Sequence, residues 1–146
     1  MPVTVRPLEK SDQAEWRRLW TAYLDFYETR LPEEVYASTW ERLFAPGPHE
    51  PRGWIASLDG RPVGLVHAIV HRTCWAIADN CYLQDLYADP DVRGKGIGRA
   101  LIEQVYRHAD ELGANNVYWL TQEGNATARR LYDRVARYGG FIKYQR

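Results

Sequence analysis

A glycine-rich segment at the head of an amphipathic stretch carries the residues best suited to binding chemistry. It consists of Arg93, Gly94, Lys95, Gly96, Ile97, Gly98 and Arg99. Glycine has no Cβ, so its backbone N–H group can approach a ligand closely. The start of the following helix adds unpaired amides and the positive end of the helix dipole, and the cationic side chains add charge-assisted donors. The segment therefore predicts a site for a phosphate or pyrophosphate group.

The spacing of the glycines argues against two common nucleotide-binding loops. A Walker loop places Ser or Thr after its Gly-Lys pair, whereas Gly96 follows Lys95. A Rossmann fingerprint has two residues between its last two glycines, whereas Ile97 alone separates Gly96 from Gly98. Neither loop fits. A plain helix N-terminus with a flexible entry is the alternative that the segment by itself leaves open.

A second set of residues could bind an amine. Aromatic residues recur at three- and four-residue spacing between Trp16 and Tyr27, and Glu28 follows directly. Aromatic faces and carboxylates both stabilise ammonium groups, so this end of the stretch could form the entrance for a cationic amine, with Tyr27 and Glu28 as substrate-binding residues. The alternative is a core-facing helix whose acidic flank is solvated.

Periodicity and turn residues place these groups on alternating strands and helices. Strands are expected at 3–8, 54–58, 62–71, from 82 to the Asp89-Pro90 turn, at 116–121 and at 141–145. Helices are expected from the Ser11-Asp12 cap to 27, at 33–44, from 97 to the stop at Gly113, and from the Asn125 cap to the break at Tyr138. Asp59-Gly60 is typical of a hairpin turn. The resulting order, β-α-α-β-β-β-α-β-α-β, predicts a mixed α/β (α+β) domain.

Composition and charge exclude several classes of partner. With 146 residues the chain is expected to form a single domain spanning 1–146. Nineteen basic and nineteen acidic side chains give a formal net charge of zero, so neither nucleic acid nor an anionic membrane is an expected partner. Cys74 and Cys81 are too few for a disulfide framework or a four-ligand metal site. His67 and His71 are interpreted as ordinary strand residues, so no metal is expected. The few cysteines and the lack of a long apolar run predict a reduced, cytoplasmic location.

Two motifs give the chain a resemblance to a known family. Arg-x-x-Gly-x-Gly, at Arg93, Gly96 and Gly98, resembles the acetyl-CoA pyrophosphate loop of the GNAT superfamily of N-acetyltransferases. Asn-x-x-Ala-x-x-Leu-Tyr, at 125–132 and before Gly140-Phe141, resembles the closing motif of that superfamily. The element order agrees along the whole chain. The resemblance implies a GNAT fold, whose mixed central sheet is splayed at the acetyl-CoA site.

The resemblance also implies an activity and a set of roles. The activity is acetyl-CoA-dependent transfer of an acetyl group, by direct attack, to a primary amine of a small molecule, an amino acid or a protein. The strand at Leu86, Tyr87 and Ala88 would pair with the pantetheine arm, the segment 93–99 would bind the pyrophosphate, and Asn125 would contact CoA. Tyr132 would protonate the leaving thiolate. Asp85 and Glu123 are the carboxylates expected to take the amine's proton or to bind its ammonium form.

A closer likeness concerns the acceptor. The Trp-rich first helix and the segments 82–87 and 117–121 look like those of fungal acetyltransferases that act on histones, other proteins and D-amino acids. Polyamine and thialysine acetyltransferases carry a Glu-Asp pair where this chain has Gln84 and Asp85. Gln84 is therefore expected to contact the substrate, and the missing carboxylate disfavours a polyamine without excluding a monoamine.

Two further expectations follow from the same features. The fungal likeness and an excess of six Trp and ten Tyr make a homodimer plausible. A CoA-binding sensor or interaction module without turnover is the alternative function. Tyr132 together with Asp85 and Glu123 favours the enzyme, because a binding module needs none of them.

Overall fold

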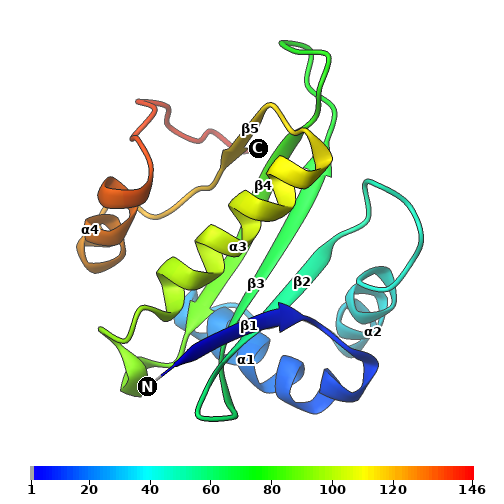
Figure 1. The fold of residues 1–146 in the computed structure, drawn as a ribbon, viewed down its shortest axis with the longest axis vertical. Helices are drawn as coiled ribbons and strands as arrows, with labels where there is room; N and C mark the ends of the chain where they lie inside the picture. The colour runs from blue at the N-terminus through cyan, green and yellow to red at the C-terminus, as the bar shows by residue number, and fades with distance from the viewer. Residues whose placement is uncertain (1) are drawn as a thin grey trace.

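A computed structural model describes residues 2–146, which form one five-stranded sheet with helices on both faces (Figure 1). The strands lie in the order β1 (Val3–Pro7), β2 (Arg52–Leu58), β3 (Arg61–His71), β4 (Asn80–Ala88) and β5 (Asn116–Tyr118). The helices are α1 (Gln13–Phe26), α2 (Glu33–Arg42), α3 (Ile97–Leu112) and α4 (Ala126–Val135), with short 3₁₀ helices η1 (Lys10–Asp12) and η2 (Pro90–Val92). β1 to β4 are antiparallel neighbours and β5 is parallel to β4. The predicted mixed α/β fold is confirmed.

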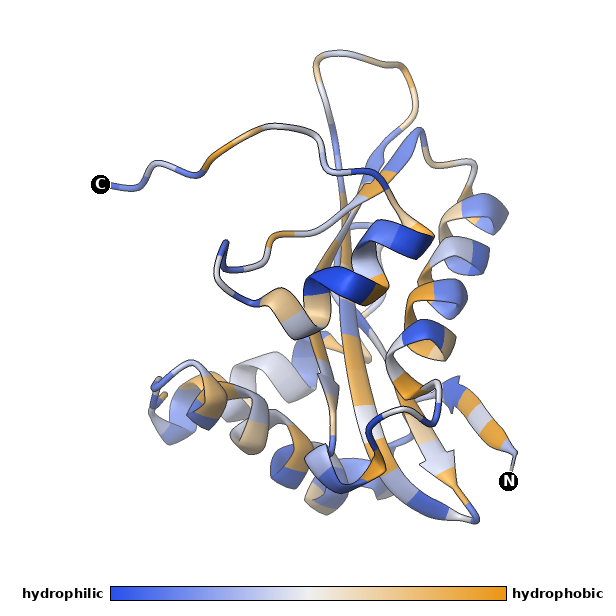
Figure 2. Ribbon diagram, turned by 90° about the vertical axis from the view of Figure 1, so that its left-hand side faces the viewer, coloured by the Kyte–Doolittle hydropathy of each residue, from blue (hydrophilic) through white to orange (hydrophobic). Residues whose placement is uncertain are grey.

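The two faces of the sheet carry different cores. On one face α3 buries an aliphatic cluster against β3 and β4, including Ile97, Leu101, Ile102 and Val105. On the other face α1 and α2 bury an aromatic cluster that includes Trp16, Trp20 and Tyr36. Figure 2 shows the sheet between these two layers, with apolar residues concentrated along the strands. Gly64 of β3 lets α3 lie close, since a Cβ there would stand 2.6 Å from Cγ2 of Ile97.

The sheet opens between β4 and β5. Only Asn80, Cys81 and Tyr82 of β4 pair with β5, whereas β3 pairs with β4 as far as Ala88. The chain beyond Tyr118 leaves the sheet and leads to α4 (Figure 1). The splay that the family resemblance implied is therefore present, and the strand expected at 116–121 ends three residues early. It is short because the chain must turn away from β4 to reach α4.

The last expected strand, at 141–145, is wrong. No strand is present there, and Phe141 and Tyr144 are 83% and 87% exposed. Alternation of apolar side chains is a local signal, but a strand also needs the edge of a neighbour, and the three-residue β5 offers little of one. Phe26, expected on the apolar stripe of the first helix, is also exposed, because it lies past the last turn that packs on the sheet.

Among residues 2–146, no helix has the length and apolarity needed to cross a membrane. The hairpin prediction is confirmed, since β2 and β3 meet at Asp59 and Gly60, whose φ angles of 53° and 76° suit the turn that joins twisted strands.

Candidate active site

A β-bulge in β4 determines the face of the sheet on which Asp85, one of the predicted catalytic residues, lies. His67 of β3 pairs with Asp85, and the next residue, Ala68, pairs with Leu83, so Gln84 is an extra residue in β4. Leu83 before the bulge and Leu86 after it both pack in the aliphatic core. Asp85 is therefore turned to the opposite face, toward α1. Gln84 itself is exposed at the bulge.

The carboxylate of Asp85 lies in a mostly buried, aromatic environment. Its side chain is 14% exposed, and Oδ2 lies 2.8 Å from Nδ1 of His67. Burial raises the pKa of Tyr23, and the charge of Asp85 and a hydrogen bond to it raise that pKa further. Burial and then the charge of Asp85 likewise raise the pKa values of Tyr27 and Tyr82. The phenols thus stay protonated around one carboxylate, an arrangement that can receive an ammonium group.

The glycine segment forms an exposed loop at the N-terminus of α3. Gly94 and Gly96 have φ angles of 78° and 81°, which L side chains rarely adopt, and a Cβ at either position would meet nothing within 4 Å. The first helical hydrogen bond runs from the amide of Ala100 to the carbonyl of Gly96. The amides before Ala100 belong to the first turn, which a helix cannot satisfy itself, so they point to an anion site.

Other residues of this segment serve the loop indirectly. Ile97 is 2% exposed, so its side chain anchors the helix and only its amide can face a ligand. A Cβ on Gly98 would stand 3.2 Å from Cδ2 of Leu131, so this glycine lets α4 approach α3. Arg99 forms an ion pair of 2.9 Å with Glu103, whereas Arg93 and Lys95 are exposed beside the loop.

The end of β4 offers a free backbone edge between the loop and Asp85. Leu86, Tyr87 and Ala88 pair with β3 through one edge, and β5 no longer follows them on the other. Leu86 and Ala88 pack against the aliphatic core, which fixes the strand. The amides and carbonyls of the outer edge can therefore bind an extended ligand arm.

α4 brings Tyr132 to the same site. Its ring stands edge-on to that of Trp119, with 5.4 Å between the ring centroids. Burial raises the pKa of Tyr132 to about 12, and ionisation of the nearby Tyr27 would raise it further. Tyr132 thus keeps its proton and lies within electrostatic reach of Tyr27, which neighbours Asp85. Asn125 caps α4 by accepting a 3.4 Å hydrogen bond from the amide of Ala128. The structure therefore joins Tyr132, Tyr27 and Asp85 in one region.

The carboxylates of Glu123 and Glu28, both predicted to belong to the site, form no hydrogen bond or ion pair with its other side chains in the part of the chain that the structure describes. Glu123 is exposed in the turn before α4, where its carbonyl accepts a 2.8 Å bond from Arg129. Glu28 is exposed, with a φ of 54°, just past the end of α1. Within residues 2–146, no hydrogen bond or ion pair connects either side chain with Asp85, Tyr27 or Tyr132.

Sequence reasoning missed His67, Trp16 and Tyr23 as parts of the site. His67 was interpreted as an ordinary strand residue, and the two aromatic residues as part of a stripe. The one available signal was that the strands expected at 62–71 and from 82 follow one another in the chain, since consecutive strands often lie side by side. The register that pairs His67 with Asp85 depends on the β-bulge, which the local sequence does not predict.

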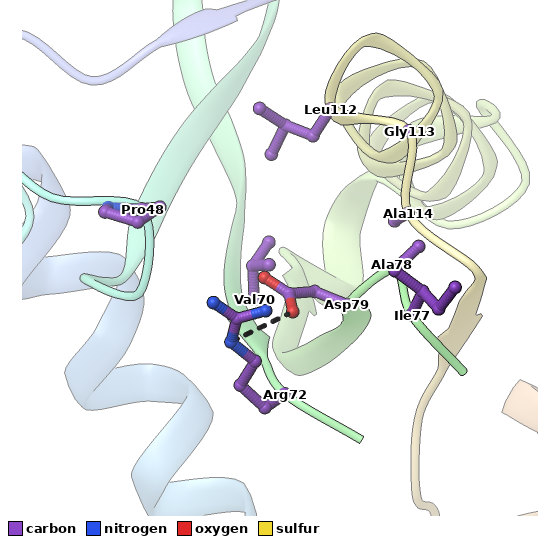
Figure 3. A pocket seen from close by; sticks show the side chains of 9 residues that line it. All are labelled: Pro48, Val70, Arg72, Ile77, Ala78, Asp79, Leu112, Gly113 and Ala114. Atoms are coloured by element: carbon purple, nitrogen blue, oxygen red, sulfur yellow. Dashed lines mark ion pairs between the residues drawn. The ribbon is translucent and has the colours of Figure 1, made fainter. Parts of the chain in front are cut away.

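A separate hollow of about 240 Å³ lies at the other end of α3 (Figure 3). Its lining includes Arg72, Asp79 and Gly113, and Nε of Arg72 stands 3.9 Å from Oδ1 of Asp79. Because α3 spans Ile97–Leu112, at about 1.5 Å per residue, this hollow is far from the glycine loop. Among residues 2–146, no group of three or more His, Cys, Asp or Glu side chains is arranged to hold a metal ion.

An opened sheet edge leading to an anion-binding helix N-terminus suits an enzyme that binds a nucleotide-linked acyl thioester. Residues 15–136 match the family described as the Acetyltransferase (GNAT) family, and the chain belongs to that family. It is an N-acetyltransferase that uses acetyl-CoA to acetylate an amine. In particular, it is 36% identical over 148 residues to the D-amino-acid N-acetyltransferase HPA3 of Saccharomyces cerevisiae, covering 99% of this chain and 90% of that protein.

Solved structures agree on the fold. The aminoglycoside acetyltransferase AAC(6')-Iy, in complex with a bisubstrate analogue, matches with a TM-score of 0.85 at 18% identity, covering 100% of this chain and 98% of that one. The ribosomal-protein-alanine N-acetyltransferase of Brucella melitensis biovar Abortus 2308 matches with a TM-score of 0.77 at 23% identity, covering 99% and 98%.

Proposed function

We propose that this enzyme acetylates the primary amine of a free amino acid, and that Asp85 receives the amine as its ammonium form. The observation that carries the proposal is the single, mostly buried carboxylate of Asp85 among the phenols of Tyr23, Tyr27 and Tyr82. A single carboxylate suits a single ammonium, and the neighbouring position is the uncharged Gln84. The relative that acts on D-amino acids supports an amino-acid acceptor, with the D form as the first candidate.

The chemistry is a direct attack of the neutral amine on the thioester. An alkylammonium has a pKa of about 10, so a proton must first leave it, to Asp85 or to water beside it. Glu123 is the second candidate for this base. The amine nitrogen then bonds to the acetyl carbon, an amide of the Leu86–Ala88 edge stabilises the carbonyl oxygen, and the carbon–sulfur bond breaks. Tyr132 gives its proton to the departing thiolate.

The acceptor proposal is tested by following thiol release from acetyl-CoA over D- and L-amino acids, polyamines, aminoglycosides and histone-tail peptides. A D-amino acid is expected to turn over fastest. Asp85→Asn is then expected to raise the KM for that amine about tenfold or more, with the KM for acetyl-CoA unchanged. Asp25→Asn, an exposed carboxylate on α1, is the matched control and should be silent. An unchanged amine KM in Asp85→Asn would remove the proposal.

The assembly and location are also part of the proposal. A homodimer is supported by exposed apolar side chains on the β3–β4 loop and the C-terminal segment, among them Trp75 (91% exposed) and Phe141 (83% exposed). Two free cysteines, Cys74 and Cys81, support action in the reducing cytoplasm, and the zero net charge supports action without nucleic acid or an anionic membrane. Sedimentation of the full chain tests the dimer, and a monomer at micromolar concentration would contradict it.

A further inference from the structure

The imidazole of His67 is buried, and both of its ring nitrogens are engaged. His67 is 3% exposed on the face that α1 covers, and the ring of Trp20 stands edge-on to it at 5.6 Å. Nε2 lies 3.0 Å from Nε1 of Trp16, and Nδ1 lies 2.8 Å from Oδ2 of Asp85. A polar ring in an aromatic core is costly to bury unless it is hydrogen-bonded, and here both nitrogens are.

The indole of Trp16 determines where His67 carries its proton. An indole N–H can only donate, so Nε2 of His67 must be the acceptor and carries no proton. The neutral ring then has its proton on Nδ1 and donates it to Oδ2 of Asp85. Oδ2 of Asp85 therefore accepts this hydrogen bond, whether or not Oδ1 is protonated.

From this geometry we infer that His67 is a positioning residue of the acceptor site, whose Nδ1–H, fixed by Trp16, holds Oδ2 of Asp85 and leaves Oδ1 to meet the amine. The inference rests on the proposed role of Asp85 in receiving the ammonium. It also sets the path of the proton. A proton that Asp85 takes from the ammonium is carried on Oδ1 and leaves to water, because Nδ1 of His67 already holds one.

The position of Asp85 explains why the hydrogen bond from His67 matters. The residue follows a bulge in β4 and lies where β5 no longer pairs with that strand, so only β3 pairs with it. A carboxylate free to rotate there would lose part of the advantage of a fixed geometry. On the α1 side, the phenol of Tyr23 lies near enough for the charge of Asp85 to raise its pKa, after the larger effect of burial. Two elements therefore orient one side chain of β4: β3 through His67, and α1 through Trp16, which fixes the ring of His67.

Two substitutions at His67 separate positioning from packing. In His67→Asn the amide nitrogen falls near the place of Nδ1 and can still donate to Asp85, but Trp16 loses its acceptor. In His67→Gln the longer side chain reaches the place of Nε2 and can still accept from Trp16, but Asp85 loses its donor. Both variants remove the ring, so both are expected to lower the melting temperature.

Kinetics with acetyl-CoA and the D-amino acid that turns over best in the acceptor screen distinguish the two. His67→Gln is expected to raise the amine KM about ten- to a hundredfold with the acetyl-CoA KM unchanged, while His67→Asn stays within about threefold of the native enzyme. Equal amine KM values in the two variants would overturn the inference. If Asp85→Asn leaves the amine KM unchanged, it is instead the proposed role of Asp85 in binding the amine that is wrong.

A measurement on the unmodified enzyme does not depend on an acceptor or on the folding of a variant. ¹⁵N-edited spectra of the histidine-labelled full chain are expected to show the His67 proton on Nδ1 and none on Nε2. Trp16→Phe, which removes the indole donor, identifies the His67 signal by shifting it. A proton found on Nε2 of His67 in the native enzyme would overturn the inference by itself.

Discussion

The two sides of the active site hold their functional groups by different means. On the acceptor side, defined here as Tyr23, Tyr27, His67 and Asp85, the groups are side chains that a buried aromatic core orients. On the donor side, defined as the 93–99 loop and the outer edge of 86–88, the groups are mainly backbone amides that glycines leave accessible. A carboxylate needs neighbours to fix it, whereas a helix N-terminus is fixed by the helix.

This difference predicts where single substitutions act. On the acceptor side, one change removes a group that several neighbours have positioned, so turnover or the amine KM should suffer. On the donor side, most side-chain changes leave the amides in place, so only a change that displaces the backbone should matter much. Substitutions on each side test this division, and so does a change at Tyr132, which belongs to neither side alone.

Tyr132 sits on α4 but lies within reach of Tyr27, and the largest effect is expected there. Tyr132→Phe removes only the hydroxyl, so turnover should fall about 100- to 10,000-fold, the usual contribution of a general acid. The acetyl-CoA KM and the melting temperature should change little. Because burial raises the pKa of Tyr132 to about 12, the acid stays protonated throughout the neutral range. The fold reduction in turnover caused by Tyr132→Phe should therefore be constant from about pH 6 to 9.

Tyr138→Phe is the control for that variant, since this tyrosine follows α4 and is 67% exposed. It should be nearly silent. If Tyr132→Phe retains most of the native turnover, water or the substrate protonates the thiolate, and the site then depends on side chains only for binding the amine.

The donor side should respond most to a change of backbone conformation. Gly96→Ala forces an alanine into a left-handed conformation at the head of α3, at a cost of about 1–2 kcal/mol. Its Cβ would enter the open space where the pyrophosphate is expected, so we expect the CoA dissociation constant to rise about tenfold by calorimetry.

Gly113→Ala is a matched control on the same helix. Gly113 has a φ of 68°, also meets nothing within 4 Å, and ends α3 at the opposite terminus. It should lower the melting temperature as much as Gly96→Ala does, while CoA binding stays native. Equal CoA affinity in the two variants would mean that the loop does not approach the ligand through its backbone.

The same division explains what the sequence could predict. The glycine loop, the cap at Asn125 and the hairpin at Asp59-Gly60 are specified by residues close together in the chain, and the structure has each of them. The direction of Asp85 depends on a bulge set by pairing with β3, and its link to His67 depends on that register. The false strand at 141–145 has the same origin, because strand pairing is not a local property.

The smallest effect is expected from the basic side chains of the donor side. Lys95 is exposed beside the loop, so Lys95→Ala should remove one screened contact to the pyrophosphate, worth about 0.2–1 kcal/mol, and raise the acetyl-CoA KM about 1.5- to 5-fold. The increase should shrink as salt rises, since the Debye length falls to about 3 Å at 1 M. Arg99→Ala should do less, because its guanidinium already forms a 2.9 Å ion pair with Glu103. If Arg99→Ala raises the acetyl-CoA KM more than Lys95→Ala does, then Arg99 leaves Glu103 to bind the phosphates. In that case side chains as well as backbone amides bind acetyl-CoA.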